Sequence, residues 1–477
     1  MYNFNRQPAT ENSTSETLED LKRKTLLHTK QLLALIQRFR LGEDHIDPKT
    51  FREAIQFTRN LSVQYLWIDS LCILQDSVMD WRHQSALMGD IYRNCFCNIA
   101  ATSSSNSHGG LFVERNPNLV RPPTVTIRRR QRDHELTDPR RYHVWDSSLW
   151  RNHVQFSPLN RRGWVLQERL LAPRVVHFSK YVFWECNSLI ACDALPSGQF
   201  FGFAVEGEGF YTRFLAIIEK ISDKEHKGEK TKHVQMARDL WRDVVRTYSK
   251  CILTKDEDIL VAISGIANIM ESTLNDQCIA GLWRSTLLED LLWISITAVR
   301  LFPCRAPTWS WASMKGATLP RGIFQGDVDR LENLVEIKDI QLKTSGDARN
   351  GQVETGYLTF EGLVFELSCK EDKYLQNVSS WNFEVEVDFD DKNAFGSPRN
   401  ERQYTKVLGL PIYMRSIPKM IIIHGLVIEL APCEYPEGHF VRIGTFWFML
   451  RLKEDRPSVE DIQLELKEHE RRIIVLA

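Results

Sequence analysis

The spacing of hydrophobic and polar positions predicts alternating helices and strands in the first part of the 477-residue chain. Leucines recur at helical spacing from Leu18 to Phe39, among lysines and arginines, which predicts an amphipathic helix. A second helix is expected from Pro48 to about Asn60, with Asp47 as its N-cap. The nearly continuous apolar run from Tyr65 to Leu74 predicts a buried strand, because strands of a parallel sheet are covered on both faces.

The alternation continues beyond this run. Apolar positions on one face predict a helix from Asp80 to Asn94, and Phe96 to Ala101 predicts a second short strand. A helix that carries Trp164 must end before Pro173, and Val175 to Cys186 predicts another strand. This order favours an α/β fold with a parallel sheet.

The pattern changes twice more along the chain. Helical periodicity resumes from Phe210 to about Trp293, with an interruption from Asp223 to Lys232, whereas strand-like segments dominate beyond Pro303. We therefore expect a disordered N-terminus (1–17), an α/β domain (18–200), a helical region (201–300) and a β-rich C-terminal module (301–477). Trp309 and Trp311 alternate as strand residues do and are expected to pack in a core.

The charge balance excludes some classes of partner. Lys plus Arg number 61 against 62 for Asp plus Glu, so no global field favours nucleic acid or an anionic membrane. The arginine-rich segment from Arg128 to Arg132 is interpreted as a solvated loop. The most apolar stretch, Leu287 to Phe302, contains charged residues and is too short to span a bilayer.

Compartment and metal content follow from the N-terminus and the cysteines. Residues 1–20 lack the apolar segment of a secretory signal, so a cytoplasmic location is expected. The ten cysteines show no spacing typical of a metal site and are interpreted as reduced, mostly buried thiols. Cys72, in the apolar run, is read in the same way. No metal and no cofactor are therefore expected.

Two segments carry the most information about identity. Tyr65-Leu-Trp-Ile-Asp-Ser-Leu-Cys-Ile-Leu-Gln-Asp76 and Arg162-Gly-Trp-Val-Leu-Gln-Glu-Arg-Leu-Leu171 resemble the heterokaryon incompatibility (HET) domain of filamentous fungi. Asp80-Trp81, Ala100-Ala101 and Phe183-Trp-Glu-Cys186 fit the same family in the expected order. The family's opening strand, Tyr-x-x-Leu-Ser-Tyr-x-Trp-Gly, is not found before Leu18, so we expect a sheet that lacks its first strand.

The resemblance implies a fold and a chemistry. HET domains are similar to TIR domains, which have a flavodoxin-like parallel sheet and in several lineages cleave the nicotinamide glycosidic bond of NAD. In TIR domains the catalytic glutamate follows a tryptophan by four residues, as Glu168 follows Trp164 here. The resemblance thus implies Glu168 as the catalytic residue, Trp164 as a wall or stacking surface, and Asp69 as a neighbour in the site.

Each of these residues also has a structural interpretation. Glu168 could pair with Arg161, Arg162 or Arg169 on the surface of its helix, and Asp69 could be a helix N-cap or a turn residue. His108 falls in a polar, glycine-rich segment that is best read as a plain loop.

Three hypotheses of function remain open at this stage. The first is a fungal HET-domain protein of nonself recognition and programmed cell death that hydrolyses NAD through Glu168 after self-association or binding of a protein partner. The second is a non-catalytic interaction module, and the third is a degenerate, inactive HET copy. NAD enters these hypotheses as a substrate and not as a cofactor.

Overall fold

The computed structural model describes residues 48–116, 120–128, 139–198, 230–320, 330–345, 351–369, 374–377, 384–391, 407–417, 420–451 and 471–477, together with positions 214, 217–218 and 220–221. The chain divides into two compact units, 1–216 and 217–477, and each is described by itself. The predictions made for residues 1–17, the helix Leu18 to Phe39, the Asp47 cap and Arg129 to Arg132 lie outside the described residues.

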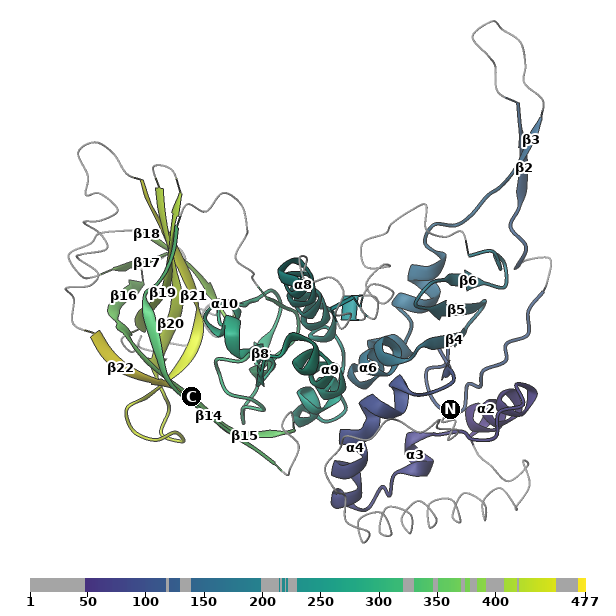
Figure 1. Ribbon diagram of the computed structural model, residues 1–477, viewed down its shortest axis with the longest axis horizontal. Coiled ribbons are helices and arrows are strands. Elements are labelled where there is room, and N and C mark those ends of the chain that lie inside the picture. Colours follow the sequence, from purple (N-terminus) through teal and green to yellow (C-terminus); the bar gives the residue numbers. More distant parts are fainter. Residues whose placement is uncertain are drawn as a thin grey trace, which may run out of the picture. The chain divides into compact units, whose positions relative to one another are not determined.

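The first unit is built on a four-stranded sheet (Figure 1). Its elements are α2 (Lys49–Asn60), α3 (Asp69–Cys72), α4 (Val78–Arg93), β1 (Asn98–Ala100), β2 (Thr124–Ile127), β3 (Arg140–His143), η2 (Arg151–Gln155), η3 (Leu159–Arg161), α6 (Gly163–Leu171), β4 (Arg174–Phe178), β5 (Val182–Cys186) and β6 (Ile190–Cys192). The strand order is β1–β4–β5–β6, with β1 parallel to β4 and the other pairs antiparallel. In the part of the chain described, the expected parallel sheet is therefore present as one strand pair within a mixed sheet.

Side-chain alternation along β4 covers the sheet on both faces. Val176 and Phe178 pack toward α2, where the ring of Phe57 lies 5.0 Å from that of Phe178. His177, on the opposite face, lies against Trp150, next to η2, with ring centroids 5.7 Å apart. Helices on both faces of a sheet are the mark of an α/β arrangement.

Three predicted helices of this unit lie in the part of the chain that the structure describes, and all three are confirmed. α2 ends at Asn60, and α4 begins after Ser77, whose hydroxyl accepts the N–H of Asp80 at 3.2 Å. α6 ends at Leu171, two residues before Pro173.

Two strand predictions need correction. The segment from Val175 to Cys186 is a hairpin of β4 and β5, because the chain turns at Ser179, whose N–H donates to the Tyr181 carbonyl at 3.0 Å. The run from Tyr65 to Leu74 forms no strand: residues 63–68 are irregular, and α3 follows. Within the described residues no strand pairs with this run. An apolar run by itself does not show whether a segment is a strand or an irregular, half-buried connection.

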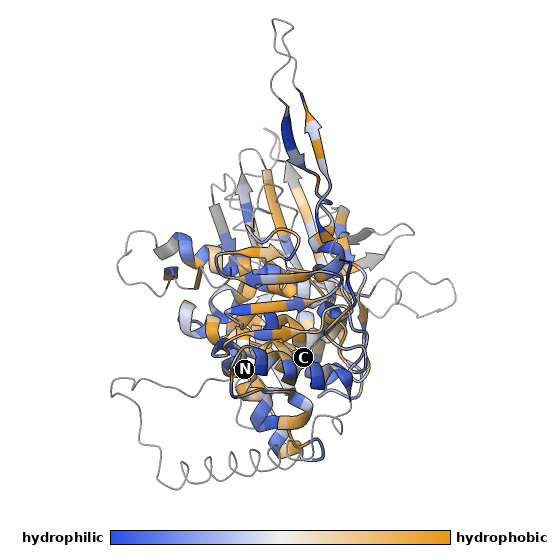
Figure 2. Cartoon of the chain, turned by 90° about the vertical axis from the view of Figure 1, so that its right-hand side faces the viewer, coloured by the Kyte–Doolittle hydropathy of each residue, from blue (hydrophilic) through white to orange (hydrophobic). Residues whose placement is uncertain are grey.

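The hairpin of β2 and β3 stands away from this sheet (Figures 1 and 2). All eight residues of its two strands are exposed. In Figure 2 one of its strands is hydrophilic, as expected for the Arg140–His143 sequence, and the other carries the hydrophobic positions Val125 and Ile127.

The second unit combines a helical part with a large sheet (Figure 1). Its helical part and small ladders comprise α8 (Lys230–Tyr248), η6 (Asp256–Ile259), η7 (Val261–Ile263), α9 (Ser264–Leu274), β7 (Cys278–Ile279), β8 (Leu282–Trp283), η8 (Arg284–Thr286), α10 (Leu287–Asp290), β9 (Ile294–Ser295), β10 (Val299–Arg300), η9 (Trp311–Ser313), β11 (Met314–Lys315) and β12 (Thr318–Leu319). The large sheet comprises β13 (Arg330–Asn333), β14 (Val335–Thr344), β15 (Val353–Leu363), β16 (Phe365–Cys369), β17 (Tyr374–Asn377), β18 (Glu384–Phe389), β19 (Val407–Ile417), β20 (Met420–Leu430), β21 (His439–Arg451) and β22 (Arg471–Leu476). A helical part followed by a β-rich part is what the hydrophobic pattern predicts.

Six strands of the large sheet close into a ring. β19 pairs with β16 and β20, and the pairing continues through β17, β18 and β21 back to β20. Buried side chains from these strands form one cluster: Leu367, Val385, Val407, Met414, Ile421, Ile423, Val427, Val441, Ile443, Phe446 and Phe448. Gly425 makes room in the ring, because a Cβ there would lie 2.5 Å from the Phe446 ring.

A buried arginine ties the helical part of this unit to its sheet. The guanidinium of Arg442 donates to both carboxylate oxygens of Asp390, at 3.1 and 2.9 Å, and to the main-chain oxygens of Leu291 and Trp293, at 2.6 and 2.5 Å. It lies 3.4 Å from the centre of the Trp293 ring. Arg300 also donates to Asp390, at 2.9 Å.

Trp309 and Trp311 are buried, as predicted, but neither lies on a strand, since Trp309 is in a turn and Trp311 begins η9. Across the described residues, no helix is both long enough and apolar enough to cross a membrane.

Candidate functional site

The first unit contains a pocket of about 210 Å³ along β1, the strand at the end of its sheet. Its walls come from α2, the segment before α3, the end of α4, β1 with its flanks, the η3–α6 segment and β4. The lining residues are Thr50, Phe51, Ala54, Leu66, Trp67, Ile68, Asp69, Ile91, Tyr92, Cys95, Cys97, Asn98, Ile99, Ala100, Ala101, Leu111, Leu159, Asn160, Arg162, Val165, Glu168, Arg169, Val175 and His177. Most are apolar, and the polar ones include two carboxylates.

Glu168 reaches the pocket from the last turns of α6. Leu166, Leu170 and Leu171 bury the helix, and Asn98 of β1 donates its side-chain N–H to the main-chain oxygen of Glu168 at 3.2 Å. The carboxylate is surrounded by protein atoms but remains partly accessible, since it lines the pocket. Its position is therefore fixed by both its helix and the neighbouring strand.

The pKa of the Glu168 carboxyl is raised to about 7. Burial is the main cause, and the negative charge of Asp69 adds to it, whereas the charge of Arg162 and a hydrogen bond from Tyr92 act in the opposite direction. Burial, followed by the charge of Glu168, holds the pKa of Tyr92 well above its usual value, so the phenol stays protonated and donates to the carboxylate. A carboxyl group that titrates near neutral pH in a pocket is typical of a functional site.

Asp69 lies at the pocket as the first residue of α3. Its Oδ1 accepts the N–H of Ser70 at 2.7 Å, and the side chain is exposed. The pocket thus brings Asp69 and Glu168 together.

Trp164 is not among the lining residues. Its ring meets that of Trp81 on α4 edge to face, with centroids 6.4 Å apart. Trp164 and Glu168 both face α4, as their four-residue spacing predicts, but toward different ends: Trp81 is near the start of α4 and Tyr92 near its end.

A buried polar network lies beside Glu168. Arg169 donates to both carboxylate oxygens of Glu185, at 2.7 and 3.0 Å, and Nε2 of His177 lies 3.0 Å from the same carboxylate. The Thr102 hydroxyl lies 3.2 Å from Nδ1 of His177. Burial alone would raise the pKa of Glu185, but the charge of Arg169 and the hydrogen bonds from His177 and Arg169 outweigh it and lower the pKa to about 2. Burial lowers the pKa of His177, so neutral His177 donates from Nε2 to an ionised Glu185.

The residues Tyr92, Asn98, Arg162 and His177 were missed as site residues by sequence reasoning. Tyr92 offered the clearest signal, because its hydroxyl falls on the predicted apolar face of α4. Asn98, Arg162 and His177 are far apart in the sequence. They meet at the pocket because β1 pairs with β4 and because Arg162 comes directly before α6.

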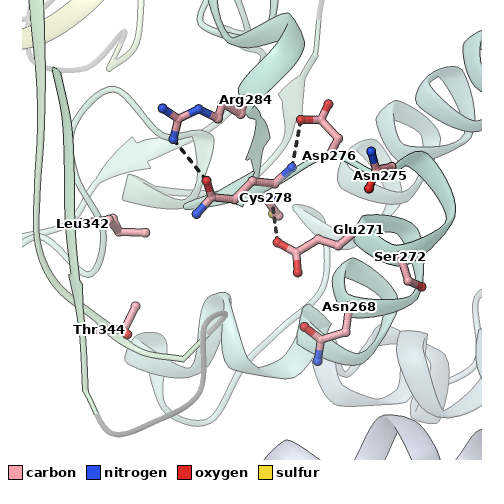
Figure 3. A pocket seen from close by; sticks show the side chains of 10 residues that line it. Asn268, Glu271, Ser272, Asn275, Asp276, Cys278, Arg284, Leu342 and Thr344 are labelled. Atoms are coloured by element: carbon pink, nitrogen blue, oxygen red, sulfur yellow. Dashed lines mark hydrogen bonds between the residues drawn. The ribbon is translucent and has the colours of Figure 1, made fainter. Parts of the chain in front are cut away.

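A second hollow, of about 870 Å³, lies in the second unit around the end of α9 (Figure 3). Two of its charged side chains bond to the loop after α9: Glu271 accepts the N–H of Cys278 at 2.8 Å, and Arg284 donates to Gln277 at 3.1 Å. Asp276 accepts the N–H of Gln277 at 2.8 Å. These bonds shape the loop after α9, and the pocket around Glu168 is the better candidate for chemistry.

Nowhere in the described ranges do three or more His, Cys, Asp or Glu side chains gather in a way that could hold a metal ion. The carboxyl of Glu168, which accepts a hydrogen bond from the phenol of Tyr92, lines the pocket and has a pKa of about 7.

Comparison with known proteins identifies the first part of the chain. The family model described as Heterokaryon incompatibility protein (HET) matches residues 13–168, a range that contains Asp69, Tyr92 and, as its last residue, Glu168. Neither the curated proteins nor the solved structures gave a match. The chain is therefore a heterokaryon incompatibility (HET) domain-containing protein.

Proposed function

We propose that the pocket of the HET domain cleaves the nicotinamide–ribose bond of NAD, with Glu168 as the catalytic carboxylate. The observation that carries this proposal is the carboxyl group of Glu168, which lines a pocket, accepts a hydrogen bond from Tyr92 and has a pKa of about 7. The resemblance of HET domains to TIR domains supports the same reaction, as an argument from analogy.

The chemistry requires one well-placed carboxylate. Cleavage of an N-ribosyl bond develops positive charge on the ribose, and a carboxylate held beside the sugar stabilises that charge. Nicotinamide carries a positive charge in NAD and leaves as a neutral molecule with the electrons of the bond, so it needs no general acid. Water then attacks C1′ of the ribose and releases a proton. In this scheme Tyr92 holds the ionised form of Glu168 in place.

The dimensions of the pocket suit part of such a substrate. A pocket of about 210 Å³ is below the range for complete drug-sized ligands, so it would receive the nicotinamide and ribose and leave the rest of the dinucleotide outside.

The biological setting of the proposal is nonself recognition and programmed cell death in fungi, through loss of NAD. Membership of the HET family supports this setting. We further propose action in the cytoplasm and activation by self-association or by a protein partner. Free cysteines throughout the described ranges are in keeping with a reducing compartment.

Nicotinamide release by the concentrated, purified protein tests the proposal. The variant Glu168→Gln keeps the size of the side chain and removes its charge, and we expect it to lower the rate by at least about a hundredfold. The matched control is Glu114→Gln, an exposed glutamate outside the pocket, which should retain the parent rate.

Equal rates for the parent and Glu168→Gln would contradict the proposal. Folded protein that releases no nicotinamide at high concentration would instead favour a non-catalytic interaction module or an inactive HET copy. The pocket would then be a gap beside the edge strand β1.

A further inference from the structure

Arg162 is a pocket residue that the proposed reaction leaves without a role. It lies just before α6 and lines the pocket together with Leu159 and Asn160. Its side chain is exposed, whereas Glu168 is partly covered, so the arginine marks the solvent side of the pocket.

The two arginines of the pocket differ in their contacts. Arg169 is buried and bonded through two nitrogens to Glu185. The guanidinium of Arg162 makes no hydrogen bond or salt bridge to any residue that the structure describes, although its charge acts on Glu168 from a distance. Its guanidinium is therefore available to an anionic group of a ligand.

The charges of the pocket define a ligand with two poles. Glu168 offers negative charge in the covered part of the pocket, and Asp69 and Arg162, which are both exposed, offer one charge of each sign on its solvent side. A molecule that fits both must carry a cation next to the carboxylates and an anion next to the arginine. A pyridinium nucleoside extended by a diphosphate has this arrangement, and a guanidinium binds phosphate oxygens through paired N–H donors.

We propose that Arg162 binds the diphosphate group of a pyridine dinucleotide and so selects dinucleotides over the corresponding nucleoside. This inference rests on the proposed function, because it assumes that the nicotinamide end enters the pocket. Arg162 is thus assigned to substrate selection, and the bond cleavage itself remains with Glu168.

Equilibrium binding in a Glu168→Gln background tests the assignment. This background prevents turnover and also removes the charge through which Arg162 acts on Glu168, so any effect of Arg162 is on the ligand alone. The probes are NAD, nicotinamide riboside, which lacks the diphosphate, and inorganic diphosphate, all at one ionic strength. The matched control is Arg161→Gln, which changes the neighbouring exposed arginine, a residue that does not line the pocket.

We expect Arg162→Gln to raise the Kd for NAD by about 10- to 100-fold, the usual effect of losing a charged hydrogen bond, and to leave the Kd for nicotinamide riboside within about twofold. Arg161→Gln should change neither value. Equal effects of the two substitutions on NAD binding would overturn the inference while leaving the proposed function intact. Arg162-dependent binding of diphosphate without any binding of NAD would overturn both the inference and the proposed function, and would leave only an anion site at Arg162.

Discussion

Opposing electrostatic influences act on the ionisation of Glu168. Burial and the charge of Asp69 favour its neutral form, whereas Tyr92 and Arg162 favour its ionised form. With a pKa of about 7, the group is divided between both forms near neutral pH, so small changes in its surroundings alter the ionised fraction. Activity that requires the carboxylate should therefore respond to pH in this range.

We expect kcat/KM for NAD cleavage to rise with pH between about 6 and 8, because the ionised fraction of Glu168 is lost as the pH falls through its pKa of about 7. Asp69→Asn removes a negative charge that raises this pKa, so the midpoint of the profile should move to lower pH. Asp76→Asn, a change at an exposed aspartate outside the pocket, is the control. If the midpoint of the pH profile is the same for Asp69→Asn and Asp76→Asn, the charge of Asp69 does not raise the pKa of Glu168.

Part of this residue-level picture could be predicted from the sequence. The sequence alone shows that Glu168 follows Trp164 by four residues and that Asp69 lies within an apolar run. It does not show the partner that tunes Glu168, because Tyr92 lies 76 positions away and meets it only when α4 packs on α6. Burial, the largest cause of the shifted pKa, is likewise a property of the fold.

At the scale of elements, α6 links three environments. Trp164, at its start, packs against Trp81 of α4. Glu168, one turn later, lines the pocket, and Arg169 bonds to Glu185 in the buried network. A helix of nine residues thus fixes the catalytic candidate through contacts on different sides. In this arrangement Trp164 orients the helix and does not form a wall of the pocket.

Trp164→Ala should lower the free energy of unfolding by about 2 to 3 kcal/mol, below the range for a fully buried tryptophan because this side chain is only half-buried. A double-mutant cycle with Trp81→Ala should give a coupling of about 0.5 to 1.5 kcal/mol, as for other edge-to-face pairs. Chemical denaturation measures both values. In the folded Trp164→Phe variant the Kd for NAD should stay within about twofold of the parent value. A large loss of affinity would instead show that Trp164 contributes to ligand binding.

The helices of the first unit were easier to predict than its strands, for a physical reason. α4 and α6 repeat their apolar positions over several turns and carry clear stop signals, such as Pro173. The run from Tyr65 to Leu74 has no such periodicity, and its conformation depends on which strand, if any, lies beside it.

At the scale of the whole molecule, the two units are stabilised in different ways. The first unit has its cores on the two faces of a small sheet, whereas the second has a filled ring of strands and a cluster of buried tryptophans. In the second unit Arg442 is fully buried, and its bonds to Asp390, Leu291 and Trp293 connect segments that are remote in sequence. The sequence predicted both regions of this unit but not the arginine that joins them, because an isolated charge in a β-rich stretch resembles a surface residue.

Arg442→Met should destabilise the second unit by about 3 to 5 kcal/mol, because it removes one partner of a buried ion pair and leaves two main-chain oxygens without their donor. Lys338→Met, which removes the solvent-exposed ion pairs of Lys338 with Glu336 and Glu361, should cost less than about 1 kcal/mol. Urea unfolding followed by tryptophan fluorescence reports on both, since Trp293 lies under the guanidinium. Similar losses for the two variants would show that Arg442 contributes no more than a surface charge.

The reach of Arg442 also bears on how the protein is made. The Leu291 carbonyl receives its hydrogen bond from a residue that is synthesised 151 positions later, and the Trp293 ring receives its cation 149 positions later. During that interval the tryptophan-rich segment around α10 is outside the ribosome with its core unfinished, which is the state in which nascent chains are most exposed to aggregation. The second unit is therefore one that must complete its folding late, and a chain whose synthesis stops short of β21 has no route to this core.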